Sequence, residues 1–314
     1  MHLPVKAKHI SQCLELAILL EASAHKPGNV SVVTNFESTR YEHFLASAVA
    51  AAPALECAAE QGIAVSDEEI HVDSVGVGRI IKNCVADINA WQHGGNTLLG
   101  AVILLVPMAV AVGMTLNEDT LEIPRLRKNL KLVVESTTPE DAVSLYEAIR
   151  IANPSGLGTA PKLDVNDSDS ANIILKEKTS LLQVFKIAEK YDSICSEWVN
   201  NYPITFDVAY PSLAKQIKNK GDLDAAVIHT FLTVLADYPD TFIARKVGFE
   251  KARRVSLTAK EVLKLGGFET SSGRQSLNRF DMELRKSSNL LNPGTTADII
   301  AAALALCVLG GYRP

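Results

Sequence analysis

The chain has 314 residues, of which 47% are hydrophobic, and its formal net charge is −5. This apolar content is enough for one large core, and the acidic balance argues against nucleic acids and anionic membranes, which bind basic surfaces. The five cysteines are scattered without a C-x-x-C pair, as is typical of buried thiols in a reducing compartment. Because the N-terminus also shows no signal peptide, we expect a cytoplasmic protein.

Helical periodicity dominates the chain, and signals for β-strands are nearly absent. Apolar residues recur at three- and four-residue spacing, whereas Asn-Gly and Asp-Gly hairpin turns do not occur. The pattern predicts ten helices, at Lys6–Ala24, Tyr41–Gln61, Asp73–Trp91, Thr97–Met114, Pro139–Ile151, Ser180–Asn200, Asp222–Ala236, Phe249–Leu265, Gly273–Lys286 and Thr296–Gly311. We therefore expect an all-α fold, a single large multi-helix bundle that forms one domain over residues 1–314.

Two of the predicted helices are apolar on every side. Residues 98–114 read LLGAVILLVPMAVAVGM, and residues 296–311 read TADIIAAALALCVLGG. Each is close to the shortest length that can span a bilayer, but neither has a flanking Lys or Arg cluster, and the first contains Pro107. Helices at the centre of a large bundle have the same composition. We interpret both as buried central helices and not as membrane spans.

Neither a Rossmann nor a P-loop glycine motif occurs, so we expect no nucleotide site of either type. Five loops rich in Gly, Pro and polar residues separate the helices, at 25–40, 93–96, 153–169, 237–246 and 287–295. The third, NPSGLGTAPKLDVNDSD, is the longest polar segment and is typical of a lid or of a connection between helix groups. The other four carry the candidate site residues.

The first of these loops follows a helix that ends near Glu21. Its Lys26-Pro-Gly28-Asn29 turn combines a mobile positive charge with a glycine that allows a ligand to approach the backbone. Such a turn suits a phosphate group, with the Glu21 carboxylate beside it. The alternative is an ordinary helix-ending turn with a solvated lysine.

The second loop, His93-Gly-Gly95-Asn96-Thr97, opens the first apolar helix. Free N–H groups at a helix N-terminus attract anions, and the paired glycines would let phosphate oxygens reach them. Asn96 and Thr97 are also ordinary N-cap residues, so a cap without a ligand is the alternative. That alternative leaves the two glycines unexplained.

The third loop places Asp240 shortly before Arg245 and Lys246 in the segment DYPDTFIARK, residues 237–246. An acid and adjacent cations in this arrangement can hold a metal ion and the phosphates bridged to it. A turn held by a salt bridge is the alternative reading of the same residues.

The fourth loop joins Asp281 to the second apolar helix through Asn292-Pro-Gly294-Thr295. Asp298 then lies one turn inside that helix. A carboxylate that faces a core must be paired or bound to a cation, which favours Asp298 as a functional residue. An acid that only stabilises the helix dipole is the alternative.

In this order, the motifs resemble the triphosphoribosyl-dephospho-CoA synthases. The resemblance runs from about residue 14 to residue 309 and rests on spaced motifs: Glu21 with Lys26-Pro27-Gly28, Asn96-Thr97 with Gly100, Gly156-Leu157-Gly158 with Leu163-Asp164-Val165, Pro239-Asp240-Thr241 with Ala244-Arg245-Lys246, and Asn292-Pro293-Gly294 with Ala297-Asp298. Members that act in citrate lyase maturation have His-Lys where this chain has Leu98-Leu99. The chain therefore resembles a divergent branch of the family.

The resemblance implies an all-helical enzyme that takes ATP and 3′-dephospho-CoA as small-molecule substrates. Such enzymes release adenine and join C1 of a triphosphoribosyl unit to a ribose 2′-hydroxyl, with Mg²⁺ beside the triphosphate. Two alternatives stay open: an enzyme similar to an N-riboside hydrolase that acts on a nucleotide, and a non-catalytic helical protein that binds nucleotides. The sequence leaves the oligomeric state open, a homodimer included.

Breaking a ribose–adenine bond builds positive charge at C1, and a nearby carboxylate stabilises that charge or deprotonates the incoming hydroxyl. We assign this role to Glu21 and Asp281, and the metal to Asp240 and Asp298. The residues assigned to ATP and its phosphates are Lys26, Gly28, Asn29, Gly95, Asn96, Thr97, Arg245, Lys246, Asn292, Gly294 and Thr295. Glu21, Lys26, Asn96, Asp240 and Asp298 are expected to line one pocket, because loops of matching composition suggest one shared ligand.

Overall fold

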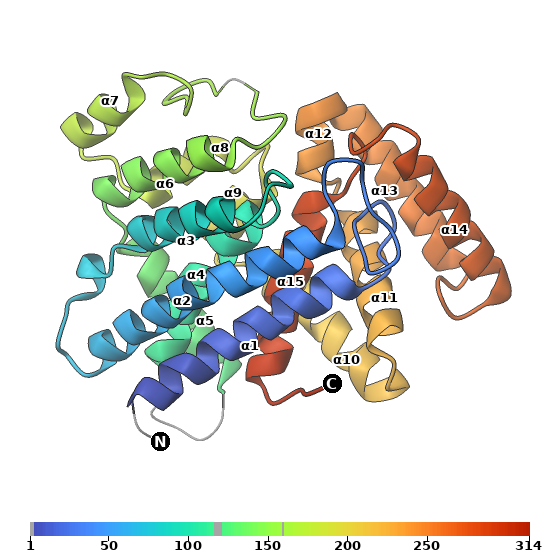
Figure 1. The fold of residues 1–314 in the computed structure, drawn as a ribbon, viewed down its shortest axis with the longest axis horizontal. Coiled ribbons are helices and arrows are strands. Elements are labelled where there is room, and N and C mark those ends of the chain that lie inside the picture. Colours follow the sequence, from blue (N-terminus) through green and yellow to red (C-terminus); the bar gives the residue numbers. More distant parts are fainter. Residues whose placement is uncertain (1–2, 116–120, 159) are drawn as a thin grey trace.

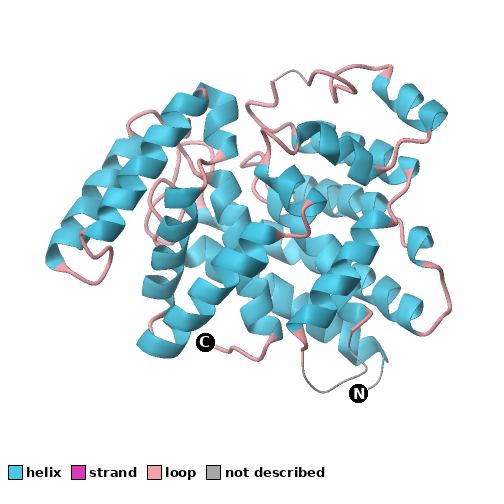
Figure 2. Cartoon of the chain, turned by 180° about the vertical axis from the view of Figure 1, so that it is seen from behind, coloured by secondary structure: helices cyan, strands magenta, loops and turns pink. Residues whose placement is uncertain are grey.

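The computed structural model describes residues 3–115, 121–158 and 160–314, and all the regular elements in this part of the chain are helices (Figure 2). The α-helices are α1 (Leu3–Ser23), α2 (Tyr41–Ser66), α3 (Val77–Trp91), α4 (Leu99–Gly113), α5 (Ile123–Glu135), α6 (Pro139–Ala152), α7 (Ser170–Glu177), α8 (Leu181–Ala188), α9 (Ser193–Val199), α10 (Tyr210–Lys220), α11 (Leu223–Asp237), α12 (Thr241–Val247), α13 (Phe249–Lys264), α14 (Ser271–Arg285) and α15 (Gly294–Leu309). Two short turns accompany them, η1 (Val72–Ser74) and the π-helical η2 (Ile204–Ala209). The predicted all-α fold is confirmed.

All ten predicted helices are present, but the one predicted over Ser180–Asn200 is divided into α8 and α9. The division lies at Asp192, whose backbone is extended and whose side chain accepts hydrogen bonds from the N–H groups of Ile194 and Cys195. A side chain that satisfies the first N–H groups of a helix starts a new helix there.

Four helices were not predicted. The helices α7 and α12 have only eight and seven residues, too few for a helical period to stand out. The helices α5 and α10 are rich in Lys, Arg and Asn, and only a narrow apolar face packs against the core. Tertiary packing stabilises such short or polar helices, and their sequence alone gives a weak signal.

The two apolar helices lie at the centre of the molecule. All side chains of residues 101–113 in α4 and 299–308 in α15 are buried, and the two helices pack against each other. In Figure 1, α1 and α2 cross in front of them, α6, α7 and α8 lie on one side, and α12, α13 and α14 on the other. Within the described residues, no helix combines the length and apolar character that crossing a membrane requires. The prediction of buried central helices is confirmed.

Glycines allow α2 and α4 to cross closely. A Cβ atom at Gly62 would lie 2.0 Å from the carbonyl oxygen of Val110, and one at Gly113 would lie 2.4 Å from that of Ala59. No side chain fits at such distances, so these glycines set the spacing of the two helices.

Pro107 leaves a gap in the hydrogen bonding of α4 that α9 fills. Proline has no N–H, so the carbonyl of Ile103 lacks its usual donor four residues later. The Nε1–H of Trp198 donates to this oxygen at 3.1 Å, and the Tyr202 hydroxyl donates to the carbonyl of Leu104 at 3.2 Å. Both side chains are fully buried, so these bonds fix the position of the α9 segment on α4.

Candidate functional site

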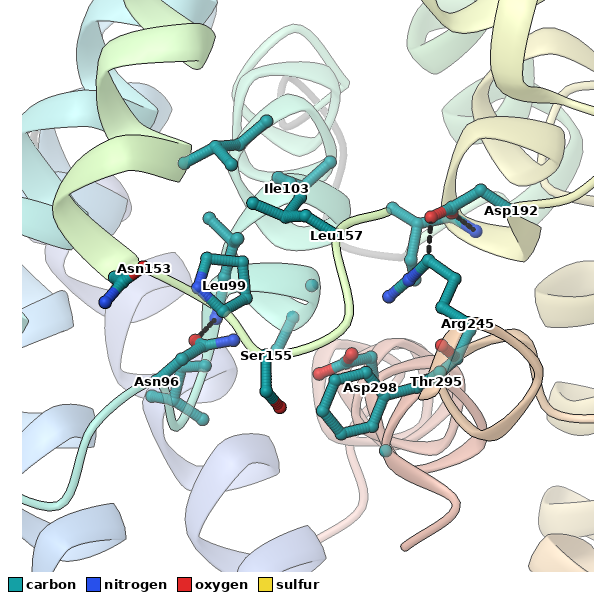
Figure 3. A pocket seen from close by; sticks show the side chains of 18 of the residues that line it. Asn96, Leu99, Ile103, Asn153, Ser155, Leu157, Asp192, Arg245, Thr295 and Asp298 are labelled. Carbon is teal, nitrogen blue, oxygen red and sulfur yellow. Dashed lines mark hydrogen bonds and ion pairs between the residues drawn. The ribbon is translucent and has the colours of Figure 1, made fainter. Parts of the chain in front are cut away.

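A cavity of about 440 Å³ opens where the N-terminal ends of α4 and α15 meet the C-terminal end of α1. The two helix groups seen in Figure 1 enclose it: α6, α8 and residues 153–158 and 160–165 on one side, and α12 on the other. Figure 3 shows Asn96, Arg245 and Asp298, which come from three distant parts of the sequence, around this space.

The structure places ten of the fifteen predicted site residues on the cavity wall. These are Glu21, Asn29, Gly95, Asn96, Thr97, Arg245, Asn292, Gly294, Thr295 and Asp298. The remaining five are not part of the described wall: Lys26, Gly28, Asp240, Lys246 and Asp281. Of the five residues expected to line one pocket, three do so, whereas Lys26 and Asp240 are not part of its described wall.

Lys26 lies behind Glu21 and is not a solvated lysine. Its side chain is only 1% exposed, its ammonium lies 3.0 Å from Oε1 of Glu21, and it donates to the carbonyls of Glu21 and Ala24. A buried charge is stable only when paired in this way. Lys26 therefore holds the Glu21 carboxylate in place at the end of α1. The positive charge of Lys26 is paired with Glu21 and does not face the cavity.

Asp298 projects from the second turn of α15 onto the first turn of α4. A Cβ at Gly100 would lie 2.1 Å from its Oδ2, so only glycine leaves room for the carboxylate. Burial raises the pKa of the Asp298 carboxyl well above its usual range, and the negative charge of Glu21 adds to this, while the N–H of Ala101 opposes it. Two carboxylates of like charge thus influence each other at the cavity wall.

Asp240 joins α12 to α15 and has both oxygens engaged. Its Oδ1 accepts from the N–H of Ile243 at 3.0 Å, and its Oδ2 accepts from the N–H and hydroxyl of Thr296, both at 2.8 Å. The side chain is 2% exposed, and burial raises its pKa. These contacts make Asp240 a cap for two helices; its assignment as a metal ligand stays a prediction that the geometry does not favour.

Asp281 and Gly28 form a second supporting contact outside the cavity. The carboxylate accepts from the N–H of Gly28 at 2.7 Å and from Nε of Arg285 at 2.9 Å. Gly28 has a φ of +73°, and a Cβ there would lie 2.7 Å from a Leu284 methyl group. The turn therefore requires glycine, and Asp281 fixes the turn from behind instead of facing the cavity.

Arg245 is the predicted cation that reaches the cavity. It forms an ion pair with Asp192 (Figure 3). Its guanidinium carbon lies 5.7 Å from the ring centre of Phe242. The Lys246 ammonium instead lies 3.8 Å from that ring centre and donates to the carbonyl of Asn289. Burial lowers the pKa of Lys246 to about 8. Asp192, which was not predicted, orients the arginine.

The loop before α4 caps the helix and also lines the cavity. Oδ1 of Asn96 accepts from the N–H of Leu99 at 3.0 Å, and the Thr97 hydroxyl lies 2.7 Å from that of Ser47. Gly95 has a φ of +76° and open space on its Cβ side. Capping therefore accounts for Asn96, and Gly95 leaves the backbone open to the cavity.

The loop before α15 presents polar groups to the same space. The Thr295 hydroxyl lies 3.3 Å from that of Thr241, and Gly294 packs against Phe242. Oδ1 of Asn292 is buried and has no hydrogen-bond partner among the described residues. A buried polar atom without a partner costs free energy, so this amide is available to a ligand.

Sequence reasoning missed the apolar half of the wall. Tyr146, Leu157, Phe185 and Tyr191 line the cavity, and the Tyr146 hydroxyl donates to the carbonyl of Leu163. The 153–169 loop carried a signal as a lid candidate, but nothing in the sequence indicated that α6 and α8 face it.

Among its described residues, the wall does not offer a complete set of metal ligands. It suits a magnesium ion that would bring phosphate oxygens as further ligands. Within the described residues, no group of three or more His, Cys, Asp or Glu side chains could hold a metal. Mg²⁺ commonly binds one or two carboxylates and completes its shell with phosphate oxygens and water. Asp298, beside Glu21 and two helix N-termini, fits that requirement.

Comparison with known proteins places the chain in one family. The family model for ATP:dephospho-CoA triphosphoribosyl transferase matches residues 7–314. A protein of Malonomonas rubra named "Probable 2-(5''-triphosphoribosyl)-3'-dephosphocoenzyme-A synthase" is 29% identical over 138 residues, which are 43% of either chain. A protein of the same name from Pseudomonas savastanoi pv. phaseolicola is 28% identical over 33% of this chain and 35% of its own. The chain thus matches less than half the length of these relatives.

A solved structure shows the same fold. It comes from Archaeoglobus fulgidus, and its protein is assigned by inference as a triphosphoribosyl-dephospho-CoA synthase. It superposes with a TM-score of 0.61 at 23% identity and covers 86% of this chain and 100% of its own. Because the family model spans nearly the whole sequence, the chain belongs to the family of ATP:dephospho-CoA triphosphoribosyl transferases.

Proposed function

We propose that this protein is a transferase that moves a triphosphoribosyl unit from ATP to 3′-dephospho-CoA, or to a related cofactor precursor, and releases adenine. The observation that carries the proposal is the convergence of Glu21, Asp298 and the N-terminal ends of α4 and α15 on one cavity. The names of the relatives support the same reaction. We further propose that the chain is a single cytoplasmic domain.

The phosphates would bind where positive potential is available. The N–H groups at the starts of α4 and α15 attract anions, and the Arg245 guanidinium, held by Asp192, adds hydrogen-bond donors. The amides of Asn29, Asn96 and Asn292 supply further polar contacts on the same wall.

Mg²⁺ bound with the triphosphate would neutralise phosphate charge, and Asp298 is the side chain that we propose as its ligand. Burial and the neighbouring charge of Glu21 raise the pKa of Asp298. A cation bound beside the two carboxylates would reduce their repulsion and favour the charged form of Asp298.

Glu21 is the group that we propose for the chemical step. Its carboxylate lines the cavity in a fixed position, since the buried Lys26 ammonium holds it from behind. It would stabilise positive charge at ribose C1 or accept the proton of the attacking hydroxyl. Asp281 lies outside the wall, so we propose that it acts only through the Gly28 turn.

The test is to follow adenine release from ATP and Mg²⁺ by chromatography, with and without 3′-dephospho-CoA, and to identify the product by mass spectrometry. Adenine release that requires the acceptor, with a product heavier by the triphosphoribosyl unit, supports the transferase. Release without an acceptor product supports the hydrolase alternative. Nucleotide binding without adenine release supports a non-catalytic binding protein.

A further inference from the structure

The cavity has two chemically different ends. One end carries the acids, amides and hydroxyls described above. The other end is lined mainly by apolar side chains of α4, α6, α8 and the segment after α6, although Lys162 and Asp164 of that segment also line the cavity. We name these apolar side chains the apolar compartment: Leu99, Ile103, Ile149, Leu157, Phe185 and Ala188. Figure 3 shows Leu99, Ile103 and Leu157 towards one end of the cavity, and Asp298 and Thr295 towards the other.

The apolar compartment is built on fixed side chains. Trp198 donates to the Ile103 carbonyl and packs edge-on against Phe185, with ring centres 4.9 Å apart. Beyond Leu157, the chain is tied back to α6 at Leu163 and Val165, because the hydroxyl of Tyr146 and Nε of Arg150 donate to their carbonyls. The walls are therefore in place before a ligand binds, which lowers the ordering cost of binding.

Apolar walls next to a charged end match a ligand with the same division. A surface of this kind gains free energy when an apolar group displaces its water, whereas a phosphate finds no donor among these six side chains. The ligand therefore has a flat or apolar part joined to a phosphorylated part, as a nucleotide does.

The amide of Asn153 adds a hydrogen-bonding edge to the apolar compartment. Asn153 ends α6 with a φ of 42°, lines the cavity, and has no side-chain hydrogen bond within the described part of the chain. An amide presents one donor and one acceptor side by side, which is the pattern that pairs with the amino group and a ring nitrogen of adenine.

We propose that the apolar compartment is a base subsite, in which the adenine ring of a substrate nucleotide lies against Leu157 and the α8 face while Asn153 contacts its edge. The inference rests on the proposed function, in which both substrates carry adenine. It goes further by placing the base at the α6–α8 end, away from Asp298.

Binding experiments with blocked variants test this. Ala188→Phe would fill the compartment from α8, and Ala214→Phe is the matched control, since both alanines are helical, partly buried at the core edge, and only Ala188 lines the cavity. Leu157→Ser removes apolar contact from a loop and serves if the first variant does not fold. Calorimetry with ATP, 3′-dephospho-CoA and inorganic tripolyphosphate, each with Mg²⁺, supplies the readout.

We expect Ala188→Phe to weaken binding of at least one nucleotide by about tenfold or more, while tripolyphosphate affinity changes by less than about twofold. A loss for ATP assigns the subsite to the donor, and a loss for 3′-dephospho-CoA assigns it to the acceptor. Wild-type nucleotide affinity in folded Ala188→Phe or in Leu157→Ser would overturn the inference.

Adenine release by the wild-type protein separates the two proposals. If the wild type binds nucleotides and loses affinity on substitution but releases no adenine, the base subsite stands and the transferase function fails. If it releases adenine but the blocked variants bind as the wild type does, the subsite alone fails. If the wild type binds neither nucleotide, both fail.

Discussion

At the scale of single residues, the buried pair of Glu21 and Lys26 sets the expected behaviour of the carboxylate that we propose for the chemical step. Glu21→Gln keeps an acceptor for the Lys26 ammonium, so the protein should fold and bind ATP. Without the charge at C1, we expect adenine release to fall by at least about 100-fold. Calorimetry and chromatography measure the two steps separately.

The control for this variant is Asp281→Asn, because Asp281 contacts the Gly28 turn from outside the cavity. It should keep most of the adenine release. Loss of turnover in Asp281→Asn together with normal turnover in Glu21→Gln would reverse the two assignments.

Asp192 is a positioning residue for Arg245. Asp192→Asn keeps a side-chain acceptor for the cap of α9 but loses the charge that holds the guanidinium. We expect the KM for ATP to rise about tenfold with little change in thermal stability. Asp222→Asn changes a cap of α11 remote from the cavity and is the control. An unchanged KM in Asp192→Asn would show that Arg245 needs no such orientation.

At the scale of elements, the contact of α9 with α4 depends on one donor. Trp198→Phe leaves the Ile103 carbonyl beside Pro107 without a partner, and a buried unsatisfied acceptor costs about 1–3 kcal/mol. Urea unfolding should therefore show a loss of stability of that size. The second tryptophan, Trp91, is 64% exposed, and Trp91→Phe should change stability little. Equal effects of the two variants would contradict the role given to this hydrogen bond.

At the scale of the whole molecule, the raised pKa of Asp298 makes stability depend on pH. A carboxyl whose pKa is higher in the folded than in the unfolded protein favours folding while it is protonated. That contribution is lost as the pH rises through the folded pKa. We therefore expect Asp298→Asn, without ligands, to raise the Tm at neutral pH and to lose this advantage in acid.

Asp207 should affect the pH dependence of stability in the opposite direction from Asp298, and it serves as the comparison. Its hydrogen bonds with Arg127 lower its pKa, so its charged form favours folding, and Asp207→Asn should not stabilise the protein at neutral pH. Melting curves across pH for both variants check the prediction. A lower Tm of Asp298→Asn at neutral pH would mean that its contact with α4 outweighs the buried charge.

The sequence by itself determined the fold class, the central helices and the loops that carry the site. Helical spacing is local, and a segment without a polar face, such as residues 101–113 of α4, has to be buried in a large helical protein. Turn chemistry is local as well, so Gly95, Asn96 and Thr295 could be placed at helix starts from their neighbours alone, and these three line the cavity.

Only the tertiary structure decided which charged side chain faces the cavity and which supports it from behind. Asp281 bonds to a residue 253 positions away, and Asp240 to one 56 positions away, so no local pattern could reveal that their oxygens are engaged. The same holds for the apolar compartment, because whether Leu157 and Ala188 meet depends on how α6 and α8 pack. A side chain's type follows from the sequence, but its partner follows from the packing of helices that are distant along the chain.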